Sequence, residues 1–352
     1  MFSSLSLPLL LVVFTIAAVA VWLSGTRLSE STDVLVDRFG FGEALGGLIL
    51  LAVATNLPEI AITASAALSG QLDIAVGNIL GGIAVQTVVL VALDAFGVGL
   101  AAPLSYRAAS LVLVLEGVMV MAVLGLVMMT AQLPSTLTIG PVEPGAVIIV
   151  VLWFTGLWVL GKARTDLPWQ AKGVAPGAAS HQKKAKPTQA TTTSKSTARA
   201  IVVFVVGAAV TLVGGVVLEK SGNLIAGDIG LSGVFFAATI LAAATALPEL
   251  STGLAAVKLG DVHLAVSDIF GGNAFLPVLF LEAGLISGAA VLPKSHPSDI
   301  YLAGLGLTLT VVYVFGLIFR PRRQVWRLGF DSWIVLILYA VGLAGLIAIT
   351  RS

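Results

Sequence analysis

Ten long apolar stretches run through this chain of 352 residues, and they restrict its fold more than any other feature. They cover, approximately, residues 7–24, 41–69, 72–98, 107–130, 144–162, 200–218, 231–259, 262–290, 299–319 and 331–350. A helix needs about 20 predominantly apolar residues to cross a bilayer. Charged residues make up 11% of the chain, against about 25% in a soluble domain. The sequence therefore predicts an all-α polytopic membrane protein with ten transmembrane helices.

One polar segment separates the first five stretches from the last five. Its core, "QAKGVAPGAASHQKKAKPTQATTTSKSTAR", is rich in Lys, Thr, Ala and Pro. A segment of this composition has too few large apolar side chains to fold around a core of its own. We predict a first repeat domain at residues 1–162, a flexible linker at 163–199 and a second repeat domain at 200–352.

The distribution of Lys and Arg predicts the orientation in the membrane. If the N-terminus lies outside, sixteen of the nineteen Lys and Arg residues face the cytoplasm, and only Lys220, Lys294 and Arg351 do not. Cytoplasmic loops carry an excess of these residues. We therefore expect both termini outside, a cytoplasmic linker and a prokaryotic plasma membrane as the location.

A repeated motif relates the two halves of the chain. The segment "ATNLPE" at 54–59 returns as "ATALPE" at 244–249, and "GNILGGIA" at 77–84 returns as "SDIFGGNA" at 267–274, both at an offset of 190 residues. Because each copy holds five helices, an odd number, the second copy enters the membrane from the opposite side. Inverted-topology repeats are typical of secondary transporters, whose binding sites lie near the bilayer midplane.

Each motif places an acid directly after a proline inside apolar sequence. The proline removes a backbone hydrogen bond and loosens the helix, and a threonine lies one turn before the acid on the same face. The side chains concerned are Thr55, Glu59, Thr245 and Glu249. A charged carboxylate at the bilayer centre costs about 2.5–3.5 kcal/mol, which a cation or proton would offset. Oxygen ligands suit hard cations such as Ca²⁺ or Na⁺, so we predict a cation site at Glu59 and Glu249.

At these residues the chain resembles the sodium/calcium exchanger family of the calcium/cation antiporter superfamily. The two repeats of that family carry G-T-S-L-P-E followed by G-N-x-x-G-S. The resemblance implies an antiporter with alternating access that exchanges Ca²⁺ for Na⁺ or H⁺ and holds no tightly bound cofactor. It also implies that the backbone carbonyls of Ala52 and Ala242 are ligands beside the threonines and glutamates.

Several positions depart from the family motif. The family serines are replaced by Asn56, Ala246, Gly82 and Gly272, and Gln86 and Leu276 stand where the family usually has Asn or Asp. The loss of these hydroxyls favours proton coupling over sodium coupling. The remaining polar candidates for the ion site are Asn78, Gln86, Asp268 and Asn273. Asp268 is expected to be the third acidic metal ligand or to line the access path.

Structural interpretations compete with these roles. The glutamates can be protonated structural carboxyls, the threonines can bond back to their own helices, Asp268 can be a cap or ion pair, and the amides can bridge helices. The glycine pairs at 81–82 and 271–272 are expected to let helix backbones approach closely.

The competing functions are a passive cation channel or leak and a degenerate family member that does not transport. The sequence contains no H-E-x-x-H motif and no convincing Ser–His pair, so no enzyme is expected. The expected partners are inorganic cations and lipid, without nucleic acid, and the sequence leaves the oligomeric state open.

Overall fold

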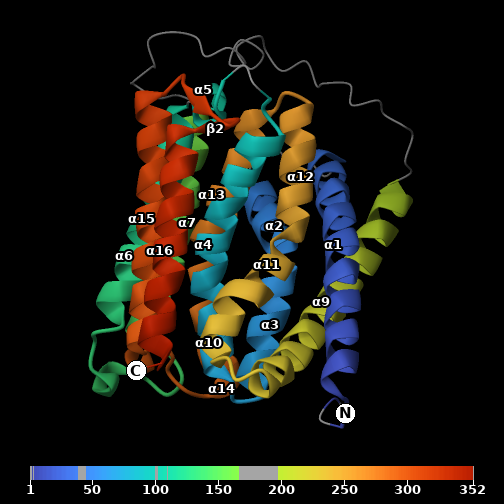
Figure 1. The fold of residues 1–352 in the computed structure, drawn as a ribbon, viewed down its shortest axis with the longest axis vertical. Helices are drawn as coiled ribbons and strands as arrows, with labels where there is room; N and C mark the ends of the chain where they lie inside the picture. The colour runs from blue at the N-terminus through green and yellow to red at the C-terminus, as the bar shows by residue number, and fades with distance from the viewer. Residues whose placement is uncertain are drawn as a thin grey trace.

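Helices from the two halves of the chain lie side by side throughout the molecule, as Leu7–Arg38 with Thr197–Asp228 and Leu111–Thr130 with Pro297–Phe319 (Figure 1). The computed structural model describes residues 2, 4–38, 45–99, 102–108, 110–165 and 197–351, so most of the predicted linker lies outside the described residues. The first half contains α1 (Leu7–Arg38), α2 (Leu45–Thr55), α3 (Leu57–Leu68), α4 (Leu72–Phe96), α5 (Leu104–Ala108), α6 (Leu111–Thr130), η1 (Ser135–Leu137) and α7 (Pro144–Thr165).

The second half has the same succession of long and broken helices. It contains α9 (Thr197–Asp228), α10 (Gly233–Phe236), η2 (Ala237–Leu241), α11 (Ala242–Thr245), α12 (Leu247–Lys258), α13 (Val262–Phe275), η3 (Leu276–Val278), α14 (Leu279–Ser287), η4 (Leu292–Lys294), α15 (Pro297–Phe319) and α16 (Phe330–Arg351). Two short antiparallel strands, β1 (Gln324–Val325) and β2 (Leu328–Gly329), form a hairpin between α15 and α16.

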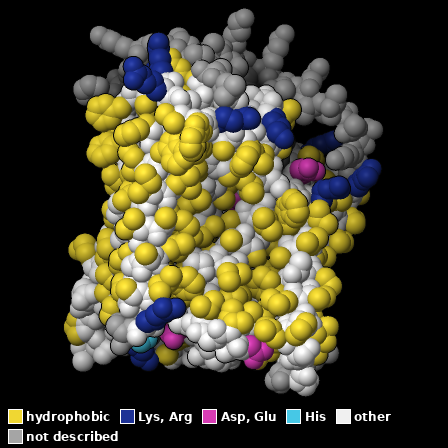
Figure 2. Space-filling view, viewed as in Figure 1, with side chains coloured by type: hydrophobic (Ala, Val, Ile, Leu, Met, Phe, Trp, Pro, Cys, Tyr) yellow, Lys and Arg dark blue, Asp and Glu magenta, His cyan; other side chains and the backbone are white. Residues whose placement is uncertain are grey.

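The predicted all-helical membrane fold is confirmed. Among the described residues, eight helices are long and apolar enough to cross a membrane, and the pair Gly233–Thr245 and Leu247–Lys258, bent by 42°, makes a ninth. In the first half, α2 and α3 form the equivalent broken pair, which accounts for the tenth predicted stretch. Figure 2 shows hydrophobic side chains over the middle of one face, with Lys and Arg gathered mainly toward the end that carries α5 and β2.

Two helices extend well beyond the apolar stretches that predicted them. Both α1 and α9 contain 32 residues, a length of about 48 Å, and they pack against each other along the edge of the molecule (Figure 1). Beyond the apolar stretch of α1, Leu28 and Leu35 are still buried, as is Ile225 in α9. Both helices therefore continue as amphipathic helices with one buried face. A search for uniformly apolar stretches does not detect such extensions.

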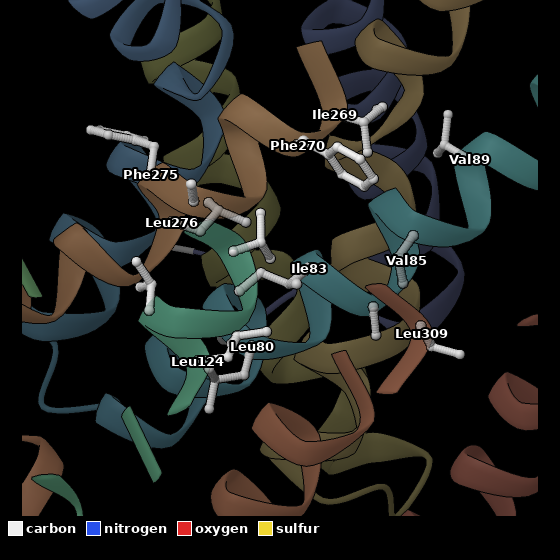
Figure 3. Packing of buried hydrophobic residues seen from close by; sticks show 14 of the residues in the cluster. Leu80, Ile83, Val85, Val89, Leu124, Ile269, Phe270, Phe275, Leu276 and Leu309 are labelled. Atoms are coloured by element: carbon white, nitrogen blue, oxygen red, sulfur yellow. The ribbon is translucent and has the colours of Figure 1, made fainter. Parts of the chain in front are cut away.

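The core is built around α4, which contacts α3, α11, α12, α13 and α15. In Figure 3, Leu80 and Ile83 of α4 lie in one cluster with Leu124 of α6, Phe270 of α13 and Leu309 of α15. Because lipid is as apolar as these side chains, close packing rather than exclusion of water stabilises the arrangement. The central position of α4 brings both broken pairs against one helix.

Equivalent turns confirm the internal repeat. The turns after α3 and α12 each contain a glycine with left-handed backbone, Gly70 with φ 71° and Gly260 with φ 91°, at the offset of the motifs. Both broken pairs are interrupted one residue before the Leu-Pro-Glu sequence, at Asn56 and at Ala246. The same local sequence thus produces the same local structure in both halves.

The carboxyl of Asp94 ties the end of α4 to three other segments. It accepts hydrogen bonds from the Leu104 amide at 2.7 Å, the Gly329 amide at 2.6 Å and the Ser332 hydroxyl at 2.7 Å. Asp94 is fully buried, so these bonds replace its water. This acid therefore anchors α5, β2 and α16.

Asp94→Ala is expected to lower the free energy of unfolding by about 2–4 kcal/mol, because two buried amide groups would lose their acceptor. Asp94→Asn keeps one acceptor oxygen and should lose less. Asp73→Ala is the matched control on the same helix, since the Asp73 side chain is 63% exposed. Denaturant unfolding in detergent measures the three changes, and a loss for Asp73→Ala as large as for Asp94→Ala would contradict the anchoring role.

Candidate functional site

The two glutamates of the repeated motif lie at helix starts inside the membrane-spanning region. Helix α2 ends at Thr55, Asn56 leaves helical geometry with φ −96° and ψ 18°, and α3 begins at Leu57 with Glu59 in its first turn. Glu249 has the same place in the first turn of α12. The N-terminus of a helix carries partial positive charge. The breaks therefore create two positive helix ends where two negative side chains sit.

Glu59 and Glu249 are buried, and no donor among the described residues meets their carboxyl oxygens at hydrogen-bonding distance and angle. Their side chains are 1% and 5% exposed, and within the described part of the chain none of their four carboxyl oxygens accepts a hydrogen bond. The carboxyls of Glu59 and Asp268 both lie close enough to Glu249 to repel its negative charge. Buried like charges without partners are costly unless a cation or proton neutralises them. A protonated structural carboxyl, the alternative interpretation, would be neutral as well, so the ligand role of the two glutamates stays a prediction.

The threonines of the motif bond back to their own helices. The Thr245 hydroxyl donates to the Ala242 carbonyl at 3.1 Å, and the Thr55 hydroxyl donates to the Ala52 carbonyl at 3.4 Å. Thr245 also lies near Glu59 of the other repeat, so the two motifs face each other. A hydroxyl that donates to a carbonyl keeps its own lone pairs, and it can still act as a ligand.

Three of the predicted amide ligands are buried on α4 and α13. Asn78, Gln86 and Asn273 are each at most 1% exposed, and the side-chain oxygen of each lacks a donor among the residues that the structure describes. Asn273 donates through Nδ2 to the Thr87 hydroxyl at 3.3 Å, which links α13 to α4. The three buried amide oxygens thus belong to α4 and to α13, which the Asn273–Thr87 bond joins.

Asn56 is a polar residue of this region that the sequence marked only as a departure from the family motif. It is 1% exposed, its Nδ2 donates to the Ala52 carbonyl at 2.8 Å, and its Oδ1 lacks a donor within the described chain. Its oxygen and that of Gln86 both face Gly272, where an added Cβ would lie 3.5 and 3.2 Å from them. In the sequence, the presence of an amide side chain inside an apolar motif could have marked Asn56 as a candidate site residue.

Asp268 lines a pocket rather than a compact acidic cluster. The pocket has a volume of about 110 Å³ and is lined by Ala52, Thr55 and Asp268 together with residues of α6 and α7. Over the described ranges, no three His, Cys, Asp or Glu side chains come together as a metal-binding group. The role of Asp268 as a third acidic ligand therefore stays a prediction, as do the ligand roles of the other predicted residues.

These features define a class of protein: a helical membrane transporter built from two inverted repeats, with broken helices that carry facing acids. The family model described as "Sodium/calcium exchanger protein" matches residues 9–161 and 199–348. The chain belongs to this family, which is a family of transporters and not of enzymes.

Relatives and solved structures agree with this assignment. The Inner membrane protein YrbG of Escherichia coli (strain K12) is 25% identical over 325 residues, which cover 89% of this chain and 92% of YrbG. The crystal structure of the H⁺/Ca²⁺ exchanger CAX matches 97% of this chain and 89% of its own, with a TM-score of 0.63 and 14% identity. A structure of the sodium-calcium exchanger NCX_Mj matches 97% and 100%, with a TM-score of 0.62 and 16% identity. At these identities the two structures establish the shared fold.

Proposed function

We propose that this protein is a secondary active antiporter that moves Ca²⁺ across the membrane in exchange for H⁺ by alternating access. The observation that carries the proposal is the pair of buried carboxyls, Glu59 and Glu249, contributed by opposite repeats and without hydrogen-bond partners in the described structure. Two carboxylates match the charge of one Ca²⁺ or of two protons. Thr55, Thr245 and the buried amide oxygens of Asn78, Gln86 and Asn273 are the further ligands that we propose for a hard cation.

The charge of this pair explains why transport would be a strict exchange. With either Ca²⁺ or two protons bound, the two glutamates carry no net charge, and the site can pass through a closed intermediate of low dielectric. With neither bound, two negative charges would have to cross that intermediate, which is costly. The site therefore changes sides only when loaded, and two protons must return for each Ca²⁺ that leaves.

The proposal that the counter-ion is a proton rests on four positions where the family motif has serine and this chain does not. Asn56, Ala246, Gly82 and Gly272 occupy these positions, so four hydroxyl oxygens that a Na⁺ ion would use are absent from the sequence. A proton binds to a single basic oxygen and does not need several coordinating oxygens as Na⁺ does. Sodium coupling is the second candidate, since Asn56 supplies an amide oxygen at one of these positions.

We further propose a prokaryotic plasma membrane as the location, with both termini outside and the linker in the cytoplasm. The distribution of Lys and Arg supports this orientation, and the relative YrbG is named as an inner membrane protein. In this orientation the pocket beside Asp268 lies in the half of the molecule nearer the cytoplasm.

Ca²⁺ uptake into proteoliposomes tests the proposed exchange. An outward proton gradient should drive uptake above the Ca²⁺ equilibrium, and an outward Na⁺ gradient at equal pH should not. Uptake driven by Na⁺ alone would replace the proton by sodium in the proposal. Flux that only runs down the Ca²⁺ gradient, without dependence on either counter-ion, would indicate a channel, and absence of flux would indicate a member that does not transport.

A further inference from the structure

An ion pair lies in the pocket lining, away from the two glutamates of the motif. Glu116 of α6 is 3% exposed, and its Oε1 accepts hydrogen bonds from Arg164 at 3.0 Å and from the Ser267 hydroxyl at 3.0 Å. Arg164 also donates to the Ser267 oxygen at 3.2 Å. The three residues come from α6, α7 and α13 and form one connected group.

This group shares the pocket with residues of the candidate ion site. Glu116, Arg164 and Ser267 line the same pocket as Thr55 and Asp268. The Arg164 side chain is 40% exposed and belongs to the last turn of α7, so it reaches Glu116 from the surface. The partly exposed Arg164, the Glu116 carboxyl and the motif residue Thr55 therefore belong to one continuous pocket lining.

The ion pair of Glu116 and Arg164 uses only one of the two carboxyl oxygens, unlike a bidentate structural salt bridge. Arginine usually binds a carboxylate through both oxygens, whereas Arg164 and Ser267 both use Oε1 of Glu116. The other oxygen, Oε2, is buried and has no partner in the part of the chain that the structure describes. The second repeat has Gly306 at the equivalent position, so the Glu116 carboxyl is not duplicated by the repeat.

We propose that Glu116 and Ser267 form a staging site for the divalent cation on its way to Glu59 and Glu249, and that Arg164 is a tethered cation that occupies Glu116 until the transported ion displaces it. The identity of the ion rests on the proposed function. While Arg164 is bound, the charge of Glu116 is neutralised and the pocket attracts cations weakly. Once Arg164 leaves, Glu116 acts together with Asp268.

A cysteine reporter can measure this charge directly. The chain has no cysteine, and no described atom lies within 4 Å of an ideal Cβ at Gly271 in the pocket lining. In a Gly271→Cys background, the reporter is labelled with a cationic and an anionic methanethiosulfonate reagent of similar size. The ratio of the cationic to the anionic labelling rate reports the charge of the pocket. The measurement does not depend on transport activity.

Arg164→Gln should raise the ratio of cationic to anionic labelling about tenfold, the effect of one unit charge a few ångströms away at a partly screened surface. Arg164→Lys should keep the original ratio, and the double variant Glu116→Gln with Arg164→Gln should restore it. Ca²⁺ should slow cationic labelling at about tenfold lower concentration in Arg164→Gln, because the tethered competitor is gone. Glu282→Gln, which removes a carboxyl outside this pocket, should change neither quantity.

Simple loosening of the helices would accelerate both reagents equally and leave the ratio unchanged, and that result would overturn the proposal. A ratio that the double variant fails to restore, or a protective Ca²⁺ concentration that is the same with and without Arg164, would also overturn it. Failure of the proposed exchange would instead appear in the uptake assay, because the labelling assay reads the pocket itself.

Discussion

Replacing Glu249 by glutamine is expected to reduce Ca²⁺ uptake at least about a hundredfold, a loss of roughly 2.7 kcal/mol of transition-state stabilisation. Glutamine has nearly the same shape as glutamate but carries no charge and cannot take up the proton of the exchange. Glu59→Gln should have the same effect, because the two carboxyls come from equivalent positions of the repeats. Initial rates of Ca²⁺ uptake into proteoliposomes, normalised to folded protein, measure the loss.

The same substitutions should stabilise the protein when no cation is present. Glu249 is 5% exposed and has no hydrogen-bond partner in the described chain, and it lies within electrostatic range of Glu59 and Asp268. Removal of its charge relieves this repulsion, so the melting temperature in chelator should rise. The further increase that Ca²⁺ gives the wild type should disappear.

Glu219→Gln is the matched control for this experiment. Glu219 is as deeply buried as Glu59, but its Oε2 accepts a hydrogen bond from Ser65 at 2.7 Å, which ties α9 to α3. This carboxyl is already satisfied by the protein, and we expect its substitution to leave uptake within a few-fold of the wild type. Full uptake by both Glu59→Gln and Glu249→Gln would remove the acid pair from the proposed site.

The sequence predicted the features that depend on periodicity and local chemistry. The apolar stretches predicted the helices, the offset of the two motifs predicted the repeat, and Pro58 and Pro248 predicted the breaks that place the acids. Each of these follows from interactions along one segment of chain. The burial of Glu59 and Glu249 followed as well, because the repeat brings both motifs to the same depth.

The features that the sequence missed depend on contacts between distant segments. Nothing near Glu116 or Arg164 indicates that they meet across 48 residues, or that Ser267 joins them from the other repeat. Asn56 was visible as a polar residue, but its proximity to Gln86 depends on how α4 packs against both broken pairs. Local patterns do not encode such pairings, which result from packing of the whole bundle.

The glycine pairs show a second limit of prediction from an internal repeat. Both glycine pairs were expected to let helix backbones approach closely. In the structure an added Cβ at Gly81 of α4 would overlap the backbone of Ala238 in η2, whereas no described atom lies within 4 Å of the one at Gly271. Gly271 faces the pocket instead. One sequence motif thus has a packed environment in one repeat and an open environment in the other.

Under the proposed alternating-access mechanism, this asymmetry corresponds to a conformation that is open on one side. If the repeats exchange roles, Gly271 packs against the part of α2 around Leu48, the position equivalent to Ala238, and a pocket opens beside Gly81. Gly81→Ala should therefore destabilise the conformation described above by about 1–3 kcal/mol through overpacking, while Gly271→Ala should leave that conformation intact and disfavour its counterpart.

A cysteine at Ala274, a buried residue of the pocket lining, reports which conformation predominates. Labelling of this cysteine should slow about 5- to 150-fold when Gly81→Ala is added, the population change that corresponds to 1–3 kcal/mol, and it should not slow with Gly271→Ala. Because both substitutions add one methyl group to equivalent positions, a general loss of packing cannot account for opposite results. Equal slowing by the two variants would show that the difference between the repeats does not reflect alternation between two conformations.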